Sequence, residues 1–206
     1  MKNYFDLKGK TAVITGGRRG LGCAMALALV ECGTRIAVIS QSLEADELKK
    51  SIEEINGEFY YIQADLSRRE ERAGLMAKVK EKFGRLDILI NNAGYLHCSL
   101  VLEYPMEQWE KDISTLLSAP FELSQQAGKI MREQGGGKII QIASTAAFKE
   151  GAGLIAYATA KSALIKMTRC LAVSLAGFNI NVNAIALGRR PGHVEKNIEK
   201  SKDKKS

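Results

Sequence analysis

Residues 11–22 place the strongest constraint on how this chain can fold. Thr11–Thr15 is a short run of apolar and β-branched residues, which is typical of a buried strand. The motif glycines Gly16, Gly20 and Gly22 follow, and then a helix-forming stretch over residues 21–29 that is apolar enough to predict a buried helix. A strand, a glycine-rich turn and a helix in this order deliver backbone N–H groups and the positive end of a helix dipole to a phosphate.

Each of the three glycines has a predicted role in such a loop. Gly16 permits a tight turn, Gly20 lets the backbone approach a ligand closely, and Gly22 lets the helix pack on the strand. The spacing alone is equally compatible with an ordinary strand-to-helix turn. The strand before the loop and the apolar helix after it favour a dinucleotide-binding site.

Size and composition predict one domain without a membrane span. The chain has 206 residues, of which 46% are hydrophobic, which is enough for an α/β domain with a sizeable core. No run of about eighteen apolar residues is present, and the first residues lack the apolar core of a signal peptide. The cysteines show neither paired nor metal-ligand spacing; they are Cys23, Cys32, Cys98 and Cys170. We therefore expect a cytoplasmic protein with no disulfide, zinc or other metal.

The net charge of +7 does not predict a nucleic-acid surface. Part of it lies in the last twelve residues, where five lysines accompany two glutamates and one aspartate. No basic helix face interleaved with aromatic residues occurs elsewhere, so a solvated basic surface is the simpler interpretation. A phosphate-bearing ligand would be favoured by such a charge.

Short apolar segments alternate with helical patterns as far as residue 188. The expected strands are Thr11–Thr15, Arg35–Ser40, Phe59–Gln63, Leu86–Ile90, Lys138–Ala143 and Asn179–Ala186. The expected helices cover 21–29, 41–55, 68–83, 105–132 with an interruption at Pro120, and 157–176. This alternation predicts a parallel sheet with helices on both faces. We expect one domain over residues 1–188 and a divergent basic tail over 189–206, either a frayed helix or disordered.

Five stretches of the chain resemble the short-chain dehydrogenase/reductase family in its single-domain type. They are Thr15 to Gly22 in the form Thr-Gly-x-x-x-Gly-x-Gly, Asp65-Leu66, Asn91-Asn-Ala-Gly94, Ser144, and Tyr157-Ala-Thr-Ala-Lys161. Each stretch alone is common, but their order and context together are specific. The resemblance implies a doubly wound, three-layer, Rossmann-like α/β fold with strand order 3-2-1-4-5-6.

The candidate catalytic residues are Ser144, Tyr157 and Lys161. The last two are one helical turn apart and share a face. A phenol is a poor acid–base catalyst at neutral pH, and lowering its pKa by about three units requires about 4 kcal/mol. A nearby ammonium and a positively charged nicotinamide ring can supply this in a partly dehydrated cleft. Taken singly, the tyrosine–lysine pair is equally a surface pair on a helix, and Ser144 a turn-forming serine.

The resemblance assigns each of these residues a role. Tyr157 would exchange a proton with the substrate oxygen. Lys161 would lower the pKa of the tyrosine and bind the nicotinamide ribose. Ser144 would hydrogen-bond the reacting carbonyl or hydroxyl. Hydride would pass between the nicotinamide ring and the substrate carbon.

The resemblance also implies a set of cofactor-binding residues, with Asp65 near the adenine. The full set is Gly16, Arg18, Arg19, Gly20, Leu21, Gly22, Asp65, Leu66, Asn91, Ala93, Gly94, Tyr157 and Lys161. For Asn91 and Asn92 the favoured role is structural, in bonds to neighbouring backbone that hold the fourth strand. A ribose contact is a second role for Asn91.

The end of the second expected strand favours NADP over NAD. An acidic residue there would hold the ribose hydroxyls of NAD and repel a 2′-phosphate, but this chain has Ser40-Gln-Ser42. Arg19, with Arg18 beside it, could pair with that phosphate. The alternative, compatible with NAD, is that both arginines are solvent-facing loop charges.

The chain departs from the family pattern in three places. Leu116 stands where an asparagine usually completes a catalytic tetrad and holds a relay water, so the route of proton supply is in question. Leu187-Gly188 replaces the usual Pro-Gly after the sixth strand. The substrate-covering segment and seventh strand of the family are not recognisable, so we expect a form shortened at its C-terminus with its sixth strand at an edge.

Two functions follow from these residues. The first is an oxidoreductase that interconverts a ketone and a secondary alcohol; residues 137–144 and 179–186 are most similar to gluconate and deoxygluconate dehydrogenases and to 3-oxoacyl-carrier-protein reductases. The second is a catalytically weak or inactive relative that binds nucleotide or partners. In either case we expect a homo-oligomer paired through the long helices, with a small-molecule substrate and with neither nucleic acid nor membrane as partner.

Overall fold

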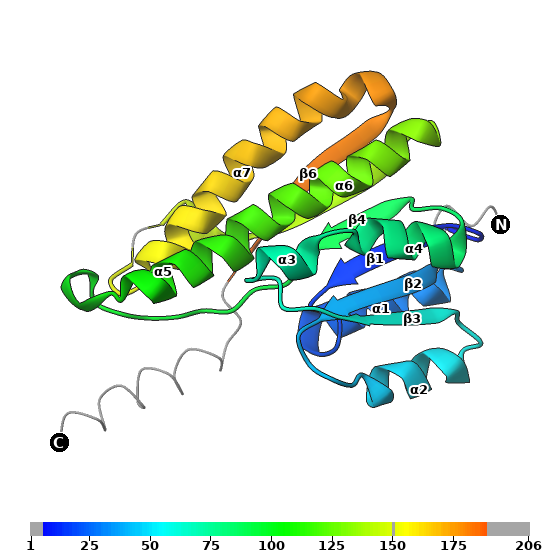
Figure 1. Ribbon diagram of the computed structural model, residues 1–206, viewed down its shortest axis with the longest axis horizontal. Helices are drawn as coiled ribbons and strands as arrows, with labels where there is room; N and C mark the ends of the chain where they lie inside the picture. The colour runs from blue at the N-terminus through cyan, green and yellow to red at the C-terminus, as the bar shows by residue number, and fades with distance from the viewer. Residues whose placement is uncertain (1–5, 150, 189–206) are drawn as a thin grey trace.

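The computed structural model describes residues 6–149 and 151–188. These residues form a six-stranded parallel sheet in the order β3-β2-β1-β4-β5-β6 (Figure 1). The strands are β1 (Thr11–Thr15), β2 (Arg35–Ser40), β3 (Phe59–Gln63), β4 (Ile88–Asn91), β5 (Gly137–Ser144) and β6 (Ile180–Leu187). The predicted doubly wound fold and its strand order are confirmed. The predicted tail over 189–206 lies outside the described residues.

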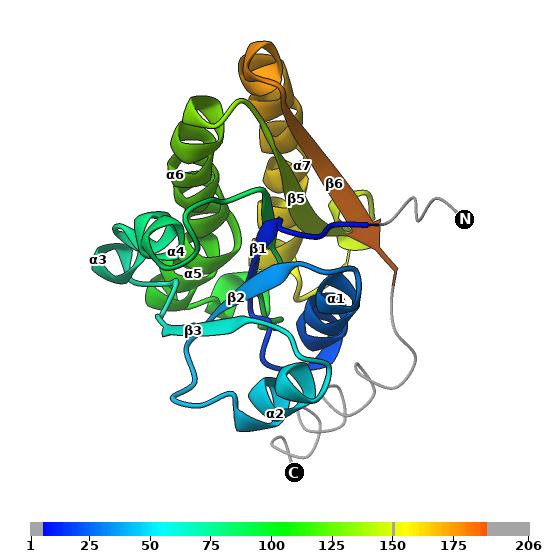
Figure 2. The same ribbon diagram turned by 90° about the vertical axis from the view of Figure 1, so that its right-hand side faces the viewer.

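Helices lie on both faces of the sheet (Figure 2). One face carries α1 (Gly20–Glu31) and α2 (Asp46–Glu54), and the other carries α4 (Leu75–Phe83), α6 (Ala119–Glu133) and α7 (Ile155–Leu175). On β6, Ile180 and Val182 are buried, whereas Asn181 and Asn183, which point to the opposite face, are exposed. Over these four residues the edge strand is therefore covered on one face only.

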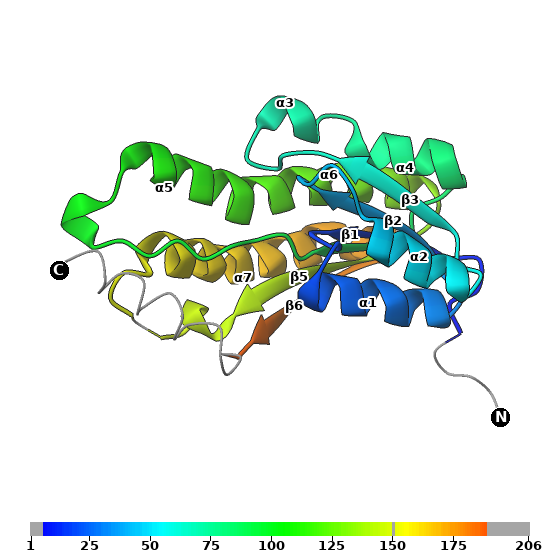
Figure 3. The ribbon, with the colours of Figure 1, turned by 90° about the horizontal axis from the view of Figure 1, so that it is seen from below.

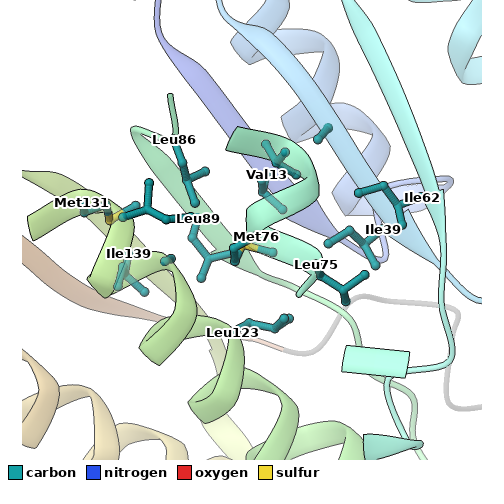
Figure 4. Packing of buried hydrophobic residues seen from close by; sticks show 14 of the residues in the cluster. Val13, Ile39, Ile62, Leu75, Met76, Leu86, Leu89, Leu123, Met131 and Ile139 are labelled. Carbon is teal, nitrogen blue, oxygen red and sulfur yellow. The ribbon is translucent and has the colours of Figure 1, made fainter. Parts of the chain in front are cut away.

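The larger core lies between the sheet and the face of α4 and α6. Val13 and Leu89 from the sheet meet Met76 and Leu123 from the helices, and all four side chains are fully buried (Figure 4). A second cluster packs β1 and β2 against α1 and α2. Burial on both faces explains why the central strands are continuous apolar runs rather than alternating ones.

The prediction that the first helix is buried was wrong. The first helix, α1, buries only Gly22, Ala26 and Val30, and its Ala24 and Ala28 are exposed, so it is a surface helix despite its apolar composition. Small alanines can line a solvent-facing side at little cost, which a count of apolar residues does not reveal.

The predicted helix over 68–83 is two helices, α3 (Arg69–Arg72) and α4. The break comes at Ala73, which is extended, and at Gly74, which has a φ of 70°. A left-handed glycine cannot continue a right-handed helix, so the chain turns there.

The long helix predicted over 105–132 is interrupted as expected. It consists of α5 (Met106–Ile113), a π-helical segment (Ser114–Ser118) and α6, which run one after another beside α7 (Figures 1 and 3). Pro120 lies in the first turn of α6 and has no N–H to donate, while Ala119 donates its N–H to the Ser114 carbonyl five residues earlier. The π segment thereby absorbs the interruption and directs Leu116 inward, where it is 1% exposed.

Candidate active site

The glycine loop between β1 and α1 is shaped for close approach. Gly16 has a φ of +65°, and a Cβ added to it would lie 2.9 Å from Ala93 Cα. A Cβ on Gly22 would lie 2.4 Å from the Gly16 carbonyl oxygen and 2.6 Å from the Asn92 side-chain amide. Gly22 therefore serves to pack α1 against the turn and Asn92, rather than against the strand as predicted.

Gly20 faces open space. It has a φ of +58°, and nothing lies within 4 Å of an added Cβ. The first turn of α1 has no side-chain cap, so its backbone N–H groups are available to an acceptor outside the helix. A diphosphate fits this combination of glycines with free N–H donors at a helix N-terminus.

Asn92 and Thr15 join the glycine loop to the end of β4. The Thr15 hydroxyl accepts the backbone N–H groups of Asn92 and Ala93, each at 2.9 Å. In return the Asn92 side-chain amide donates to the carbonyls of Thr15 at 2.9 Å and Gly16 at 3.2 Å. The structural role expected for Asn92 is present. The sequence analysis did not predict that Thr15 joins β1 to the end of β4. A hydroxyl at the end of a buried apolar strand could have indicated such a hydrogen-bonding role.

The side chain of Asn91 is occupied within the protein. It is 3% exposed, and its amide donates to Ser124 Oγ at 3.2 Å and to the Pro120 carbonyl at 3.4 Å. This agrees with the structural role that we favoured. A contact with a bound ribose would have to come from the backbone of Asn91.

Tyr157 and Lys161 lie together near the N-terminal end of α7. Lys161 Nζ is 5.6 Å from the centroid of the Tyr157 ring and donates to the Ile142 carbonyl of β5 at 2.7 Å. A Cβ added to Gly94 would be 3.9 Å from this Nζ and 3.0 Å from Leu116 Cδ2. The pair therefore meets the ends of β4 and β5, with a leucine packed beside it.

Lys161 is held in an environment that disfavours its charge. Its side chain is buried, with the residue 4% exposed, and desolvation lowers its pKa from 10.5 to about 8. Among the described residues it has no carboxylate partner. The ammonium is thus oriented by one carbonyl and left with further N–H groups to donate.

Ser144 ends β5, two residues after the carbonyl that binds Lys161. Its Oγ accepts the Ala146 N–H at 3.2 Å and caps the short 3₁₀ helix Thr145–Ala147. The turn-forming role is therefore present. The same hydroxyl retains its own proton for a second partner.

The residues expected near the adenine and 2′-phosphate lie at the ends of β2, β3 and the glycine loop. Asp65 accepts from the Gln41 side chain at 2.9 Å and from the Ser67 N–H at 2.9 Å, whereas the Leu66 side chain is in the core. Arg19 is exposed and Arg18 half-buried, and neither forms an ion pair within residues 6–149 and 151–188.

Metal ligands and membrane spans were searched over the same described residues. No group of three or more histidine, cysteine, aspartate or glutamate side chains there could hold a metal ion. No helix in that part of the chain is both long enough and apolar enough to cross a bilayer.

Comparison with known proteins identifies the family. The model of the short chain dehydrogenase family matches residues 10–205. This chain belongs to the short-chain dehydrogenase family. It is therefore a nicotinamide-dependent oxidoreductase of ketones and secondary alcohols.

Two relatives and one solved structure illustrate the match to short-chain dehydrogenases. An uncharacterized oxidoreductase of Escherichia coli (strain K12) is 39% identical over 186 residues, which are 90% of this chain and 71% of the relative. A 2-dehydro-3-deoxy-D-gluconate 5-dehydrogenase of Dickeya dadantii (strain 3937) is 37% identical over 196 residues, 95% of this chain and 76% of the relative. The structure of an NAD⁺-bound xylitol dehydrogenase has a TM-score of 0.87 and 33% identity, and the match covers 93% of this chain and 75% of that one.

The burial of Lys161 predicts a pH-dependent cost in stability. Because its pKa is lower in the folded chain, about 8 against 10.5, stability should be depressed below pH 8 and recover as the pH rises to 10.5. The shift corresponds to about 3 kcal/mol. Lys161→Met should therefore be more stable than the parent at pH 7 by up to about 3 kcal/mol, and this advantage should shrink between pH 8 and 10.5. Urea unfolding over this pH range measures it.

Lys78→Met is the matched control, because Lys78 is exposed on α4 and forms no ion pair among the described residues. It should change the unfolding free energy by less than about 0.5 kcal/mol at any pH. A stability difference for Lys161→Met that does not vary with pH would contradict the assignment of the cost to the buried ammonium.

Proposed function

We propose that Tyr157, Lys161 and Ser144 carry out the proton transfer of this short-chain dehydrogenase. The observation that supports the proposal is the convergence of the Tyr157–Lys161 pair on the ends of β4 and β5, with Lys161 Nζ buried near the Tyr157 ring and near Gly94. The glycine loop, held to β4 by Thr15, is the phosphate-binding side of the same site. A nicotinamide cofactor bound there supplies the hydride acceptor or donor.

The three side chains have different tasks in this proposal. The Tyr157 hydroxyl exchanges its proton with the substrate oxygen. The Lys161 ammonium stabilises the phenolate by its charge and donates a hydrogen bond to the cofactor ribose. The Ser144 hydroxyl donates to the substrate oxygen while it continues to accept from Ala146.

The cofactor contacts fall on backbone more than on side chains. We assign the diphosphate to the N–H groups from Gly16 to Gly22, including those of Gly20 and Leu21. The adenine lies near Asp65, and Leu66 and Asn91 contribute only backbone because their side chains are buried. Ala93 and Gly94 line the nicotinamide side.

Removal of the Tyr157 hydroxyl is the direct test. Tyr157→Phe should lower kcat by about 10²–10⁴-fold while NADPH still binds, since the phenyl ring and Lys161 remain. The measurements are NADPH oxidation with a panel of keto-sugar acids and 3-ketoacyl thioesters, and NADPH binding by fluorescence. Unchanged turnover in Tyr157→Phe would refute the assignment.

Leu116 favours a second candidate, a nucleotide-binding relative with weak or no turnover. Its side chain is 1% exposed and packs against Gly94 beside Lys161, so it brings no hydrogen-bonding group to the place where an asparagine was expected. Tight NADPH binding by the parent chain with no turnover of any substrate in the panel would favour this candidate.

For the cofactor we propose NADP, with NAD as the weaker ligand. β2 ends at Ser40 and carries no carboxylate there, Gln41 is held by Asp65, and the two loop arginines form no ion pair among the described residues. A guanidinium that faces a 2′-phosphate gains a charge-assisted bond that the NAD hydroxyl cannot offer.

Arg19→Ala should therefore weaken NADPH binding about tenfold and leave NADH binding within about twofold. Titration of both nucleotides by fluorescence measures the ratio. Arg169→Ala, an exposed arginine on α7, is the control. If Arg19→Ala weakens the binding of both nucleotides equally, Arg19 does not bind the 2′-phosphate and the proposal is wrong.

For the substrate we propose a ketone or secondary alcohol of a sugar acid, as the name of the Dickeya dadantii relative suggests. We also infer a reducing, cytoplasmic location, which is compatible with the four free cysteines of the described chain.

We further propose that the chain pairs with itself through its long helices. An apolar groove of about 520 Å³ lies between the π segment, α6 and α7, and Leu117, Phe121 and Met167 are among its lining residues. Phe121 is 45% exposed, an unfavourable position for a large apolar ring unless a partner covers it. Sedimentation velocity should show a dimer or larger species at micromolar concentration, and a strict monomer would refute the pairing.

A further inference from the structure

The loop over residues 95–104 connects β4 to α5 and lies beside the site. It begins at Tyr95, directly after Gly94, whose added Cβ would be 3.9 Å from Lys161 Nζ. In its middle, the Ser99 N–H donates to the Gly153 carbonyl at 3.2 Å, two residues before α7 begins. The loop therefore contacts both sides of the site, the end of β4 and the entry to the helix that carries Tyr157.

The two ends of this loop meet at one carboxylate, Asp112 of α5. The hydroxyl of Tyr104, the last residue of the loop, donates to Asp112. The side-chain amide of Gln108 donates to Asp112 at 2.7 Å and to the hydroxyl of Tyr95, the first residue of the loop, at 3.3 Å. The His97 ring packs edge-on against Tyr104 at 5.5 Å and closes this neck.

Asp112 is an unusual group to bury. It is 2% exposed, and it forms no ion pair with any described residue. A buried carboxylate without a cation costs several kcal/mol unless hydrogen bonds satisfy it. Here its two side-chain donors are neutral: the hydroxyl of Tyr104 at one loop end and the amide of Gln108 in the adjacent turn of α5, which also holds Tyr95 at the other loop end.

The tyrosines are suited to the role of donor. Desolvation, and then the hydrogen bond and charge of Asp112, raise the pKa of Tyr95 to about 12, and the same causes raise the pKa of Tyr104. Both phenols therefore keep their protons at neutral pH, and Tyr104 donates its proton to the carboxylate while the hydroxyl of Tyr95 accepts from Gln108.

The tip of the loop cannot hold itself in place. Leu100, Val101 and Leu102 are 54%, 63% and 97% exposed, so they bury little area against the rest of the protein. The loop is therefore fixed by the contacts that its other residues make with α5 and with the entry to α7. The hydrogen bonds at Asp112, together with the one between Ser99 and Gly153, hold the loop in position.

We propose that Asp112 is a positioning residue that clamps both ends of the 95–104 loop and so fixes Gly94 against Lys161 and the substrate-side wall of the site. It acts through Tyr95, Gln108 and Tyr104 and does not touch the reacting atoms. The functional part of this inference rests on the proposed function, whereas the clamp itself does not.

Amide hydrogen exchange of the chain without cofactor tests the clamp directly. Asp112→Asn removes the charge at nearly constant volume and should speed exchange of the amides of residues 95–104 about tenfold, while the amides of β1 and β4 keep their protection. Glu110→Gln, an exposed carboxylate on the same helix, is the matched control and should leave the loop unchanged. Unchanged exchange in Asp112→Asn would overturn the proposal.

Tyr95→Phe and Tyr104→Phe separate a clamp from independent contacts. Each should speed exchange of the loop in the parent chain and add less than about twofold when Asp112 is already Asn, because Tyr104 bonds to that carboxylate and Tyr95 is linked to it through Gln108. Fully additive effects would overturn the clamp. If Asp112→Asn does not fold, Tyr104→Phe and the Tyr95→Phe/Tyr104→Phe double variant supply the same comparison, and undisturbed loop exchange in both would overturn it.

Kinetics then test the consequence for the site. Asp112→Asn should raise KM for the ketone about tenfold, following the loop opening, with NADPH affinity within about twofold of the parent. A merely destabilised protein would instead lose active fraction, with KM unchanged, and that result would overturn the positioning role. If the parent turns over no substrate, the proposed function fails while the exchange experiment still decides the clamp.

Discussion

The hydroxyl of Thr15 is the contact on which the geometry of the site depends. It accepts two consecutive N–H groups from the end of β4, and the Asn92 side chain returns two bonds to the end of β1. These bonds make the glycine loop and the residues beside Lys161 one rigid unit, although 77 positions of sequence separate Thr15 from Asn92. The close approach of the loop and the end of β4 also requires glycine at positions 16 and 22. A Cβ on Gly16 would collide with Ala93, and a Cβ on Gly22 would collide with the turn itself. A dinucleotide spans the glycine loop and the nicotinamide side, so the distance between them has to be set before a ligand arrives.

Lys161 shows how the fold accepts a cost at this site. The ammonium is buried against β5 with one carbonyl as its protein partner, and its pKa falls because the charge is desolvated. A core residue of the same size without charge would be more stable there. Its position near the Tyr157 ring is the observation on which the proposed proton transfer rests. Asp112 shows a comparable arrangement, where a buried carboxylate is satisfied by two neutral donors, the Tyr104 hydroxyl and the Gln108 amide.

Local signals predicted the parts of the fold that local physics controls. The strands Thr11–Thr15, Arg35–Ser40 and Phe59–Gln63 have the predicted bounds, because short apolar β-branched runs between turn residues have few other stable conformations. The break at Gly74 was missed, since a glycine within a charged amphipathic pattern is compatible with a continuous helix until its φ is known. Asp112 was missed for a similar reason. On an amphipathic helix a single aspartate looks solvated, and its burial results from Tyr95 and Tyr104 on a separate segment.

The sequence by itself determined the strand–glycine–helix unit, the parallel sheet and the chemical identity of the candidate residues, whereas the strand order was implied only by the resemblance to the family. These features depend on residue type and spacing, which are visible without coordinates. Only the tertiary structure decided which side chains form hydrogen bonds and packing contacts inside the protein. It directs Asn91 into α6, packs Leu116 beside Lys161, and brings Tyr104 to a buried carboxylate and Tyr95 to the glutamine bonded to that carboxylate. The reason is physical: burial and hydrogen-bond partners depend on contacts between segments distant in the chain, and no local pattern encodes how those segments approach.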